Sequence, residues 1–596
     1  MGWHFRRLAE LEEGEKLNIP QREVFRTLLE FVKPYKLRVF LLAIVIFSGI
    51  FVNLVIPLVT KFIIDSIVDQ DIPGLFTYSI VFLSVILFNL LLSSSQTYLN
   101  SWLGQTLIYD IRNKMYWHLI RIKQKYFGGQ ETGKLVSRLT NDVDTIGNAF
   151  TSGLIDTLAN LFQLFGAIFI MFSLSIELSI VVLSLIPLII LSSWYFARRA
   201  RKAFRESRKK IAEVTSKIEQ NVSGAKVVQA FSYRRQKNIE SFSRINRENL
   251  EVNVQANKVI SSIGPTMSII RAMGIALIIW FGGILVGYGR LKLGTLVAFY
   301  GYVDMFFRPI MTITMFYNTL QSTLAAAERV TDFLRWEVEE DKGELNEVKG
   351  LGEIEYRNVV FGYEENIPVI KDVSFRVSPG EKVAIVGPTG SGKTTLVNLL
   401  LRFYDPWSGE ILLDGIDIRK YRLRVLRRTI AFVPQEPILF NGTVYENMIL
   451  SSENVSKEEV LKLLDFLDLR DLIESLPEGL DTKILEGGKN ISMGQRQVIS
   501  FIRALISNPR ILVLDEATSS LDLYTEEKLQ KALEKMSKGR TMITIAHRLQ
   551  TIINSDRIIV IHNGKIVEEG KHSELLKKKG LYAKLYESQF ATVQHK

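Results

Sequence analysis

The chain has 596 residues, of which 47% are hydrophobic and 23% are charged, with a formal net charge of +11 and no cysteine. This length exceeds what one hydrophobic core supports, so we expect several domains. The lack of cysteine excludes disulfides, cysteine-ligated zinc, iron–sulfur clusters and thiol nucleophiles. The positive charge points either to nucleic acid or to loops that face anionic lipid.

Long uncharged runs fill the first half of the chain. They cover residues 39–60, 72–109, 157–176, 178–197, 259–270 and 272–289, and another apolar stretch covers 293–327. A membrane-spanning helix needs about 20 apolar residues. The alternative is that these runs form buried helices of a large soluble protein. The number of such runs in one half of the chain disfavours that alternative. We therefore predict six transmembrane helices, at about 37–68, 76–122, 140–174, 176–218, 248–288 and 293–325.

The distribution of Lys and Arg predicts the orientation in the membrane. Neither residue occurs between 62 and 111 or between 139 and 197, whereas the N-terminus and residues 198–258 are rich in both. Because basic loops stay in the cytoplasm, we expect the N-terminus and the 2–3 and 4–5 loops there. Arg290 and Lys292 in the 5–6 loop run against this rule. The net charge is thus a topology signal, and no nucleic-acid partner is expected.

The N-terminal residues 1–35 are predicted to be cytoplasmic. Within them, apolar and basic side chains alternate over residues 22–35, which indicates an amphipathic helix on the inner membrane surface.

Several charges interrupt the predicted spans: Asp156, Arg271, Asp304 and Arg308. Such charges usually face the bundle interior or a watery cavity. Asp304 and Arg308 are spaced i, i+4 and could pair on one helix face, an alternative to a substrate contact. Aromatic and Met side chains nearby could form an adaptable apolar cavity, although packing against lipid or other helices is the commoner reason for such a stripe. These side chains are Trp280, Phe281, Tyr300, Tyr302, Met305, Phe306, Phe307, Met311, Met315 and Phe316.

The composition changes after an acidic linker. We place the transmembrane domain at 36–328, the linker at 329–350 and a second domain at 351–596. In the second domain, short β-branched runs such as Val383–Val386 and Ile511–Leu514 alternate with helical patterns, which indicates an α/β domain.

The first of these runs leads into a phosphate-binding loop of the form G-x-x-x-x-G-K-T. Its glycines let backbone N–H groups converge on phosphate oxygens, and the following helix adds its positive end. Lys393 is expected at the β- and γ-phosphates, and Thr394 at Mg²⁺. The predicted nucleotide-binding residues here are Gly387, Pro388, Thr389, Gly390, Ser391, Gly392, Lys393, Thr394 and Thr395.

The second run ends in Asp515 and Glu516. A buried strand would deliver both carboxylates to its C-terminal edge. There Asp515 would hold Mg²⁺ and Glu516 would orient or deprotonate the attacking water. The alternative is that the two carboxylates are only the solvated end of a strand. The presence of a phosphate loop in the same domain disfavours this alternative.

Further motifs surround these two. Tyr363 follows Phe-Gly, Gln435 follows Val-Pro, Ile491–Gln495 reads Ile-Ser-Met-Gly-Gln, Ser519–Asp522 reads Ser-Ser-Leu-Asp, and His547 follows Ile-Ala. Their order resembles the ATP-binding cassette family. Six spans ahead of one cassette resemble an exporter half-transporter of that family, of the multidrug or lipid-A type. The resemblance implies a six-helix membrane bundle fused to an α/β P-loop domain, with ATP and Mg²⁺ as cofactors.

The resemblance also implies roles for these residues. Tyr363 would stack on adenine, although a core tyrosine is the alternative. Gln435 would contact Mg²⁺ and His547 the γ-phosphate, beside the catalytic Glu516. In the family, two cassettes dimerise, and the signature of one, here Ser492, Gly494 and Gln495, caps the ATP of the other.

The signature departs from the usual Leu-Ser-Gly-Gly-Gln because Met493 replaces the first glycine. A side chain here would crowd the place where backbone must approach phosphate. Both sites of a homodimer would suffer, but only one site of a heterodimer. We therefore expect a heterodimer in which this chain carries the competent Glu516. A homodimer that tolerates Met493 is the alternative.

The resemblance further suggests that short transverse helices near 126–134 and 222–232 couple cassette to membrane, with Phe127 and Phe231 as anchors. The expected function is ATP-driven export of hydrophobic or amphiphilic compounds across the bacterial cytoplasmic membrane. A lipid flippase, a peptide exporter and an ATP-gated channel are the alternatives.

Overall fold

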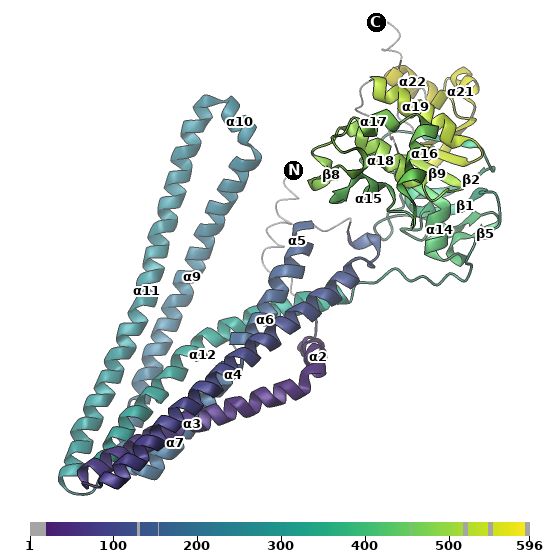
Figure 1. Ribbon diagram of the computed structural model, residues 1–596. Helices are drawn as coiled ribbons and strands as arrows, with labels where there is room; N and C mark the ends of the chain where they lie inside the picture. The colour runs from purple at the N-terminus through teal and green to yellow at the C-terminus, as the bar shows by residue number, and fades with distance from the viewer. Residues whose placement is uncertain are drawn as a thin grey trace. The chain divides into compact units, whose positions relative to one another are not determined.

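The computed structural model describes residues 19–127, 132–152, 154–452, 454–515, 523–545 and 552–590. The chain forms two compact units, which are described separately (Figure 1). The helical unit comprises the residues before 121 together with 131–336. The cassette unit comprises residues 121–130 and 337–596.

The helical unit consists of long helices joined by short connections. Its elements are α2 (Gln21–Val32), η1 (Lys33–Tyr35), α3 (Lys36–Val68), α4 (Ile72–Leu119), α5 (Thr132–Ser137), η3 (Arg138–Asp142), α6 (Val143–Ser152), α7 (Leu154–Leu174), α8 (Ile176–Leu183), α9 (Ile186–Ser223), α10 (Ala225–Ala230), α11 (Ser232–Gly287) and α12 (Leu293–Leu334).

Among the described residues, five helical segments are long and apolar enough to cross a membrane. They lie within 21–68, 72–119, 157–174, 176–223 and 235–287. The sixth predicted span falls on α12, where the side chains of residues 306–318 lie outside the description. Six spans therefore remain our prediction.

One predicted span, 176–218, is interrupted. The stretch 140–174 starts in the π-helical turn η3, which leads directly into α6, and α7 follows the undescribed residue 153. The stretch 176–218 divides into α8 and α9 just before Pro187, which occupies the first turn of α9. Proline lacks an N–H and suits a helix start, so the interruption has a local cause that our prediction missed.

Helices α9 and α11, with 38 and 56 residues, are longer than a membrane span needs. These two antiparallel helices lie side by side, and the short helix α10 closes their far end (Figure 1). At 1.5 Å per residue, the 56 residues of α11 far exceed the thickness of a bilayer. α10 lies within the predicted transverse segment 222–232.

Helices α3, α7, α8, α11 and α12 share one apolar core. Tyr302 of α12 is fully buried there, and its hydroxyl donates to the carbonyl of Leu54 on α3 at 2.8 Å. At the other end of α3, the buried Asp65 accepts a hydrogen bond from the backbone N–H of Gly294 at 2.9 Å. Asp65 thus caps the start of α12 from a different helix.

The cassette unit is α/β, as predicted. Its strands are β1 (Ile354–Phe361), β2 (Ile370–Val377), β3 (Lys382–Val386), β4 (Ser408–Leu413), β5 (Ile416–Asp417), β6 (Ile430–Val433), β7 (Gly442–Thr443), β8 (Lys483–Ile484), β9 (Ile511–Asp515), β10 (Thr541–Ile545), β11 (Arg557–His562) and β12 (Lys565–Gly570). Its helices are η2 (Gln124–Tyr126), α13 (Lys393–Leu400), η4 (Ile418–Lys420), α14 (Leu423–Thr429), α15 (Val444–Met448), α16 (Lys457–Leu467), α17 (Arg470–Glu474), η5 (Gly479–Asp481), η6 (Glu486–Gly488), α18 (Met493–Leu505), α19 (Leu523–Ser537), α21 (His572–Lys578) and α22 (Leu581–Phe590).

The described strands form a central sheet of order β12-β11-β3-β10-β9-β6, an antiparallel sheet of order β2-β1-β4-β5 and a small antiparallel sheet of β7 and β8. In the central sheet, β11, β3, β10, β9 and β6 are mutually parallel. β3 and β9 are buried nearly throughout, as their continuous apolar sequences predict for strands covered on both faces. One core cluster joins this sheet to β1, β2 and α13.

Candidate functional site

The register of the central sheet brings the predicted motifs to one edge. Ile545 pairs with Ile385 on one side and with Asp515 on the other, and Leu514 pairs with Val433. The carboxyl ends of β3, β10, β9 and β6 are therefore level. The phosphate loop follows β3, Asp515 ends β9, and Gln435 stands two residues beyond β6. Ligands of open α/β sheets bind at such an edge.

The phosphate loop has the backbone that its glycines predict. Gly392 has φ +108°, a conformation that other residues rarely adopt, and a Cβ on Gly387 would lie 2.1 Å from the carbonyl oxygen of Ile561. The ammonium of Lys393 donates to the carbonyls of Gly387 and Pro388 at 2.8 and 3.0 Å. Lys393 thus folds back over the loop from the first turn of α13.

Two hydroxyls in this loop have different surroundings. The Oγ of Ser391 is buried and has no hydrogen-bond partner among the residues that the structure describes. Thr394, one residue after Lys393, is exposed. A buried hydroxyl without a partner is unfavourable unless a ligand satisfies it. The loop therefore fits a phosphate group, and the exposed Thr394 fits a hydroxyl ligand of a divalent cation.

Tyr363 is held beside α13, with 51% of its surface exposed. Its hydroxyl donates to Thr395 at 3.2 Å and accepts from the amide of Asn398 at 3.3 Å. The rings of Phe361 and Tyr404 pack edge-on against it, each with a centroid distance of 5.2 Å. Tyr363 is therefore not the core tyrosine of our alternative interpretation.

The signature residues begin helix α18. Ser492 is its N-cap and accepts a hydrogen bond from the N–H of Gln495 at 3.2 Å, while the Gln495 side chain accepts from the N–H of Ser492 at 2.9 Å. Gly494 is buried and Met493, the first helical residue, is half-buried. The amide of Gln495 also donates to the carbonyl of Leu472 at 3.3 Å, so this side chain is used inside the cassette.

A buried glutamine links the signature helix to the segment after β6. Gln497 is 1% exposed, and its amide donates to the backbone carbonyl of Gln435 at 3.1 Å. Our sequence prediction assigned no role to Gln497. Its polar side chain on an otherwise apolar helix face is a signal that could have identified it.

Glu516 and His547 lie outside the described residues, as do residues 519–522. The strands that precede them end at Asp515 and Ile545, which are paired neighbours.

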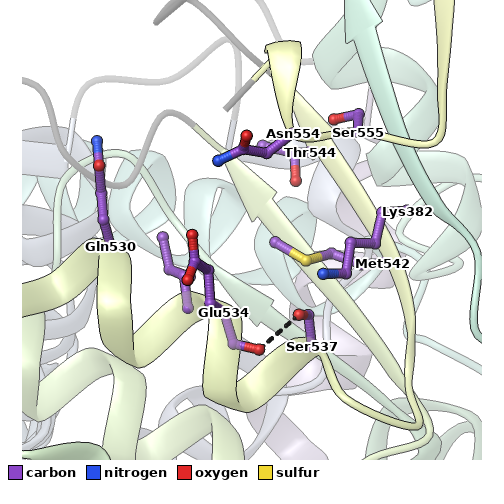
Figure 2. A pocket seen from close by; sticks show the side chains of 9 residues that line it. Lys382, Gln530, Glu534, Ser537, Met542, Thr544, Asn554 and Ser555 are labelled. Carbon is purple, nitrogen blue, oxygen red and sulfur yellow. Dashed lines mark hydrogen bonds between the residues drawn. The ribbon is translucent and has the colours of Figure 1, made fainter. Parts of the chain in front are cut away.

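A small hollow of about 60 Å³ lies elsewhere on the cassette (Figure 2). Its lining includes Lys382 and Met542, which are paired near the amino ends of β3 and β10. Glu534 and Ser537 of α19 close another side (Figure 2). The hollow is thus near the opposite ends of the strands from the phosphate loop, and it is not the nucleotide site.

In the helical unit, Asp304 of α12 pairs with Arg271 of α11. The guanidinium contacts both carboxylate oxygens, at 2.7 and 2.9 Å. The structure therefore gives Asp304 a partner on another helix, whereas its pairing with the i+4 residue stays a prediction. The side chains of Arg308 and Asp156 lie outside the description. Phe127 and Phe231 are both exposed.

Comparisons with known proteins agree with this architecture. Residues 39–310 match the family model of the ABC transporter transmembrane region, and residues 370–519 match the family model described as "ABC transporter". The chain therefore belongs to the ABC transporters, as an exporter with fused transmembrane and ATP-binding domains.

Three relatives illustrate the similarity. YknV of Bacillus subtilis, an uncharacterized ABC transporter ATP-binding protein, is 37% identical over 95% of this chain and 94% of its own length. An ATP-dependent lipid A-core flippase of Syntrophus aciditrophicus is 36% identical over 95% of both chains. A putative multidrug export ATP-binding/permease protein of Staphylococcus aureus (strain bovine RF122 / ET3-1) is 34% identical over 94% of this chain and 99% of its own. Membership implies ATP binding, ATPase-coupled transport, a multi-pass membrane protein and dimerisation.

Proposed function

We propose that this chain exports hydrophobic or amphiphilic compounds across the bacterial cytoplasmic membrane by alternating access, with the cassette and N-terminus in the cytoplasm. The observation that carries the proposal is the level edge at which the phosphate loop, Asp515 and Gln435 meet, in a chain that also has membrane-spanning helices. The multidrug export named for the Staphylococcus aureus relative supports the substrate class.

At this edge we propose a role for each group. The β- and γ-phosphates take over the ammonium of Lys393 from the carbonyls of Gly387 and Pro388, and the orphaned hydroxyl of Ser391 donates to a phosphate oxygen. The backbone N–H groups from Thr389 to Thr395 surround the phosphates. Adenine stacks on the exposed ring of Tyr363, which Thr395 and Asn398 hold in place.

Mg²⁺ has suitable ligands at the same edge. Thr394 and Gln435 are exposed, and Asp515 ends the buried strand β9, which lies beside β6 in the sheet. Hydroxyl, amide and carboxylate oxygens are the donors that Mg²⁺ prefers. Mg²⁺ would neutralise phosphate charge, while Glu516 orients the attacking water and His547 contacts the γ-phosphate.

We further propose that the transporter is a heterodimer. The dipole at the start of α18 favours a partner's phosphate near Ser492 and Gly494. Met493 places a side chain on the first residue of this helix, which impairs only the site built on the partner's phosphate loop. The phosphate loop of this chain remains competent for hydrolysis, because the signature of the partner caps the ATP bound there. ATP hydrolysis by this chain purified alone tests the idea, because full turnover by a homodimer would reject it.

The main experiment is ATP-driven transport of a fluorescent dye in inverted membrane vesicles. We expect uptake to require ATP and Mg²⁺, and Glu516→Gln to abolish uptake while nucleotide still binds. Lys382→Gln, at the hollow in Figure 2, is a control that should transport normally. Dye movement down its gradient with hydrolysis blocked would indicate a channel instead.

Lipid flipping is the second candidate. It is favoured by the 36% identity to the lipid A-core flippase. Translocation of a fluorescent phospholipid in proteoliposomes, measured beside dye transport, distinguishes the two substrate classes.

A further inference from the structure

Two short segments that are far apart in the sequence pair inside the cassette unit. Ile122 and Val338 form an antiparallel bridge. The N–H of Lys123 donates to the carbonyl of Glu337 at 3.0 Å, and the N–H of Glu339 donates to the carbonyl of Arg121 at 2.6 Å. We call residues 121–123 and 337–339 the ribbon.

Side chains reinforce the ribbon. The ammonium groups of Lys123 and Lys125 lie 2.6 and 3.1 Å from one carboxylate oxygen of Glu337. The hydroxyl of Tyr126 accepts a hydrogen bond from the N–H of Glu337 at 3.3 Å. Residues 121–127 continue the chain from α4, and residues 337–339 follow α12. The ribbon is therefore covalently continuous with two long helices.

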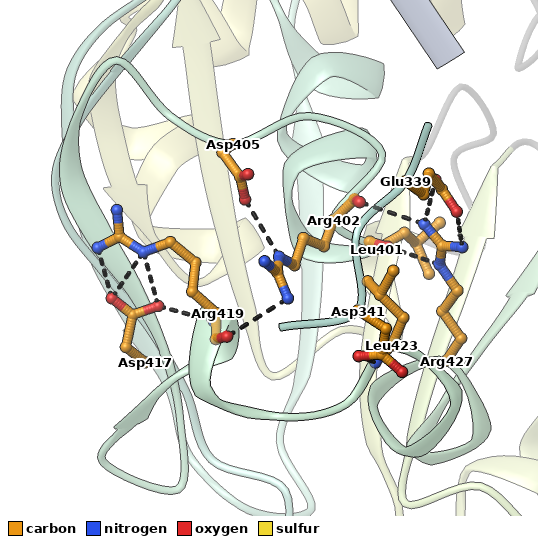
Figure 3. Close-up of polar contacts among 9 residues, drawn as sticks. All are labelled: Glu339, Asp341, Leu401, Arg402, Asp405, Asp417, Arg419, Leu423 and Arg427. Atoms are coloured by element: carbon orange, nitrogen blue, oxygen red, sulfur yellow. Dashed lines mark hydrogen bonds and ion pairs between the residues drawn. The ribbon is translucent and has the colours of Figure 1, made fainter. Parts of the chain in front are cut away.

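One ion pair clamps the ribbon to the rest of the cassette. Arg427 donates to both carboxylate oxygens of Glu339, at 2.9 and 2.8 Å (Figure 3). Less than a third of either side chain is exposed. A bidentate pair of arginine and carboxylate that is largely screened from water fixes both distance and orientation.

The same guanidinium also holds the end of the helix that starts in the phosphate loop. Arg427 donates to the carbonyls of Leu401 and Arg402, each at 3.2 Å (Figure 3). These carbonyls directly follow α13, which begins at Lys393. An eight-residue helix is a stiff element about 12 Å long, so a displacement at the phosphate loop reaches Arg427 with little loss.

Beside the clamp, the ribbon is not packed tightly. A cavity of about 420 Å³ has Lys123, Lys125, Phe361, Arg402 and Tyr404 among its lining residues. Tyr404 is also the ring that packs against Tyr363. The clamp, together with the hydrogen bond from the N–H of Leu423 to Asp341 at 2.9 Å, therefore controls the position of the ribbon.

We propose that Glu339 and Arg427 are positioning residues that transmit nucleotide binding from α13 to residues 121–127 within the same chain. This inference rests on the proposed function, because it requires ATP at the phosphate loop. The transverse helices at the tips of the inner loops are the coupling elements that we expected from the sequence. The inference adds a second route, which runs through the linker. Glu339 and Arg427 touch neither the phosphate loop nor Tyr363 in the contacts described here.

The test uses the assembled transporter with a spin label on Gln124→Cys. Gln124 is exposed beside the ribbon, and the chain has no other cysteine. Binding of a fluorescent ATP analogue and the ATP-induced change in label mobility are measured in parallel. Glu339→Gln should keep nucleotide affinity within about twofold and reduce the mobility change at least about fivefold. Arg427→Glu combined with Glu339→Arg re-forms the ion pair in reverse but should not restore the change, because a glutamate at 427 cannot donate to the carbonyls of Leu401 and Arg402.

Asp417→Asn is the matched control. Arg419 donates to both carboxylate oxygens of Asp417 in the same cassette, at 3.0 Å to Oδ1 and 2.5 Å to Oδ2, and neither residue belongs to the ribbon (Figure 3). This variant should behave as the parent, and thermal unfolding of every variant checks folding. A full mobility change in Glu339→Gln, or none in a parent that binds ATP, overturns the inference. Failure of the parent to bind ATP would reject the proposed function and the inference with it.

Discussion

At the scale of single residues, Gly494 shows why a signature position is restricted. A Cβ there would lie 2.4 Å from the methyl carbon of Thr525 on α19. Gly494→Ala should therefore push α18 and α19 apart and destabilise the cassette by about 1–3 kcal/mol. Thermal unfolding of the full chain measures this cost. Combining Gly494→Ala with Thr525→Ser removes the methyl group and should recover most of it. An unchanged midpoint in the single variant would contradict the packing argument.

Another residue-scale feature explains a charge that opposes the expected topology. The ammonium of Lys292 lies 3.2 Å from the carboxylate of Asp69, which follows α3. Asp65 lies one turn earlier and is buried against the N–H of Gly294. The basic 5–6 loop is thus locally balanced by acidic groups at the end of α3.

This arrangement predicts different roles for two neighbouring aspartates. Asp65→Ala leaves a buried N–H at the start of α12 unsatisfied and should lower stability by about 1–2 kcal/mol. Asp69→Ala breaks only an exposed ion pair and should leave the unfolding midpoint unchanged. Thermal unfolding of both variants in the same detergent makes the comparison. Equal effects would mean that Asp65 acts by charge rather than as a cap.

At the scale of elements, the ribbon depends on a charged carboxylate. Hydrogen bonds from Lys123, and then from Lys125, hold the pKa of Glu337 below its ordinary value. A carboxylate with a lowered pKa stabilises the folded arrangement above its unfolded pKa, about 4.3. That contribution is lost as the pH falls through the lower folded value.

We therefore expect acid to loosen the ribbon. A spin label on Gln124→Cys should have constant mobility from pH 8 to about pH 5 and become more mobile at lower pH. Glu337→Gln should give the mobile spectrum already at neutral pH and show a smaller pH response. A transition centred above about pH 5 would assign the titration to another group.

At the scale of the whole molecule, the proposed orientation gives a labelling pattern. Ile72 lies at the short connection between α3 and α4, and Tyr288 at the short connection between α11 and α12; both are exposed. Val227 is exposed on α10. Single cysteines at Ile72 and Tyr288 should react with an impermeant maleimide in intact protoplasts. A cysteine at Val227 should react only after permeabilisation. The reverse pattern would invert the proposed topology.

The sequence by itself determined the two kinds of domain and the order of their motifs. Uncharged runs require helices in a bilayer whatever surrounds them, because the backbone must satisfy its own hydrogen bonds there. The loop from Gly387 to Thr394 and the strand before Asp515 are equally local, since short-range pattern and glycine chemistry define them.

Only the tertiary structure decided which polar groups meet. Asp304 pairs with Arg271 on α11, Asp65 caps a helix that begins more than two hundred residues later, and Glu339 clamps to Arg427. Sequence spacing ranks i, i+4 partners but carries no information on partners from other elements, because folding brings those together through packing. The same holds for Gln495, whose side chain completes the N-terminal cap of α18.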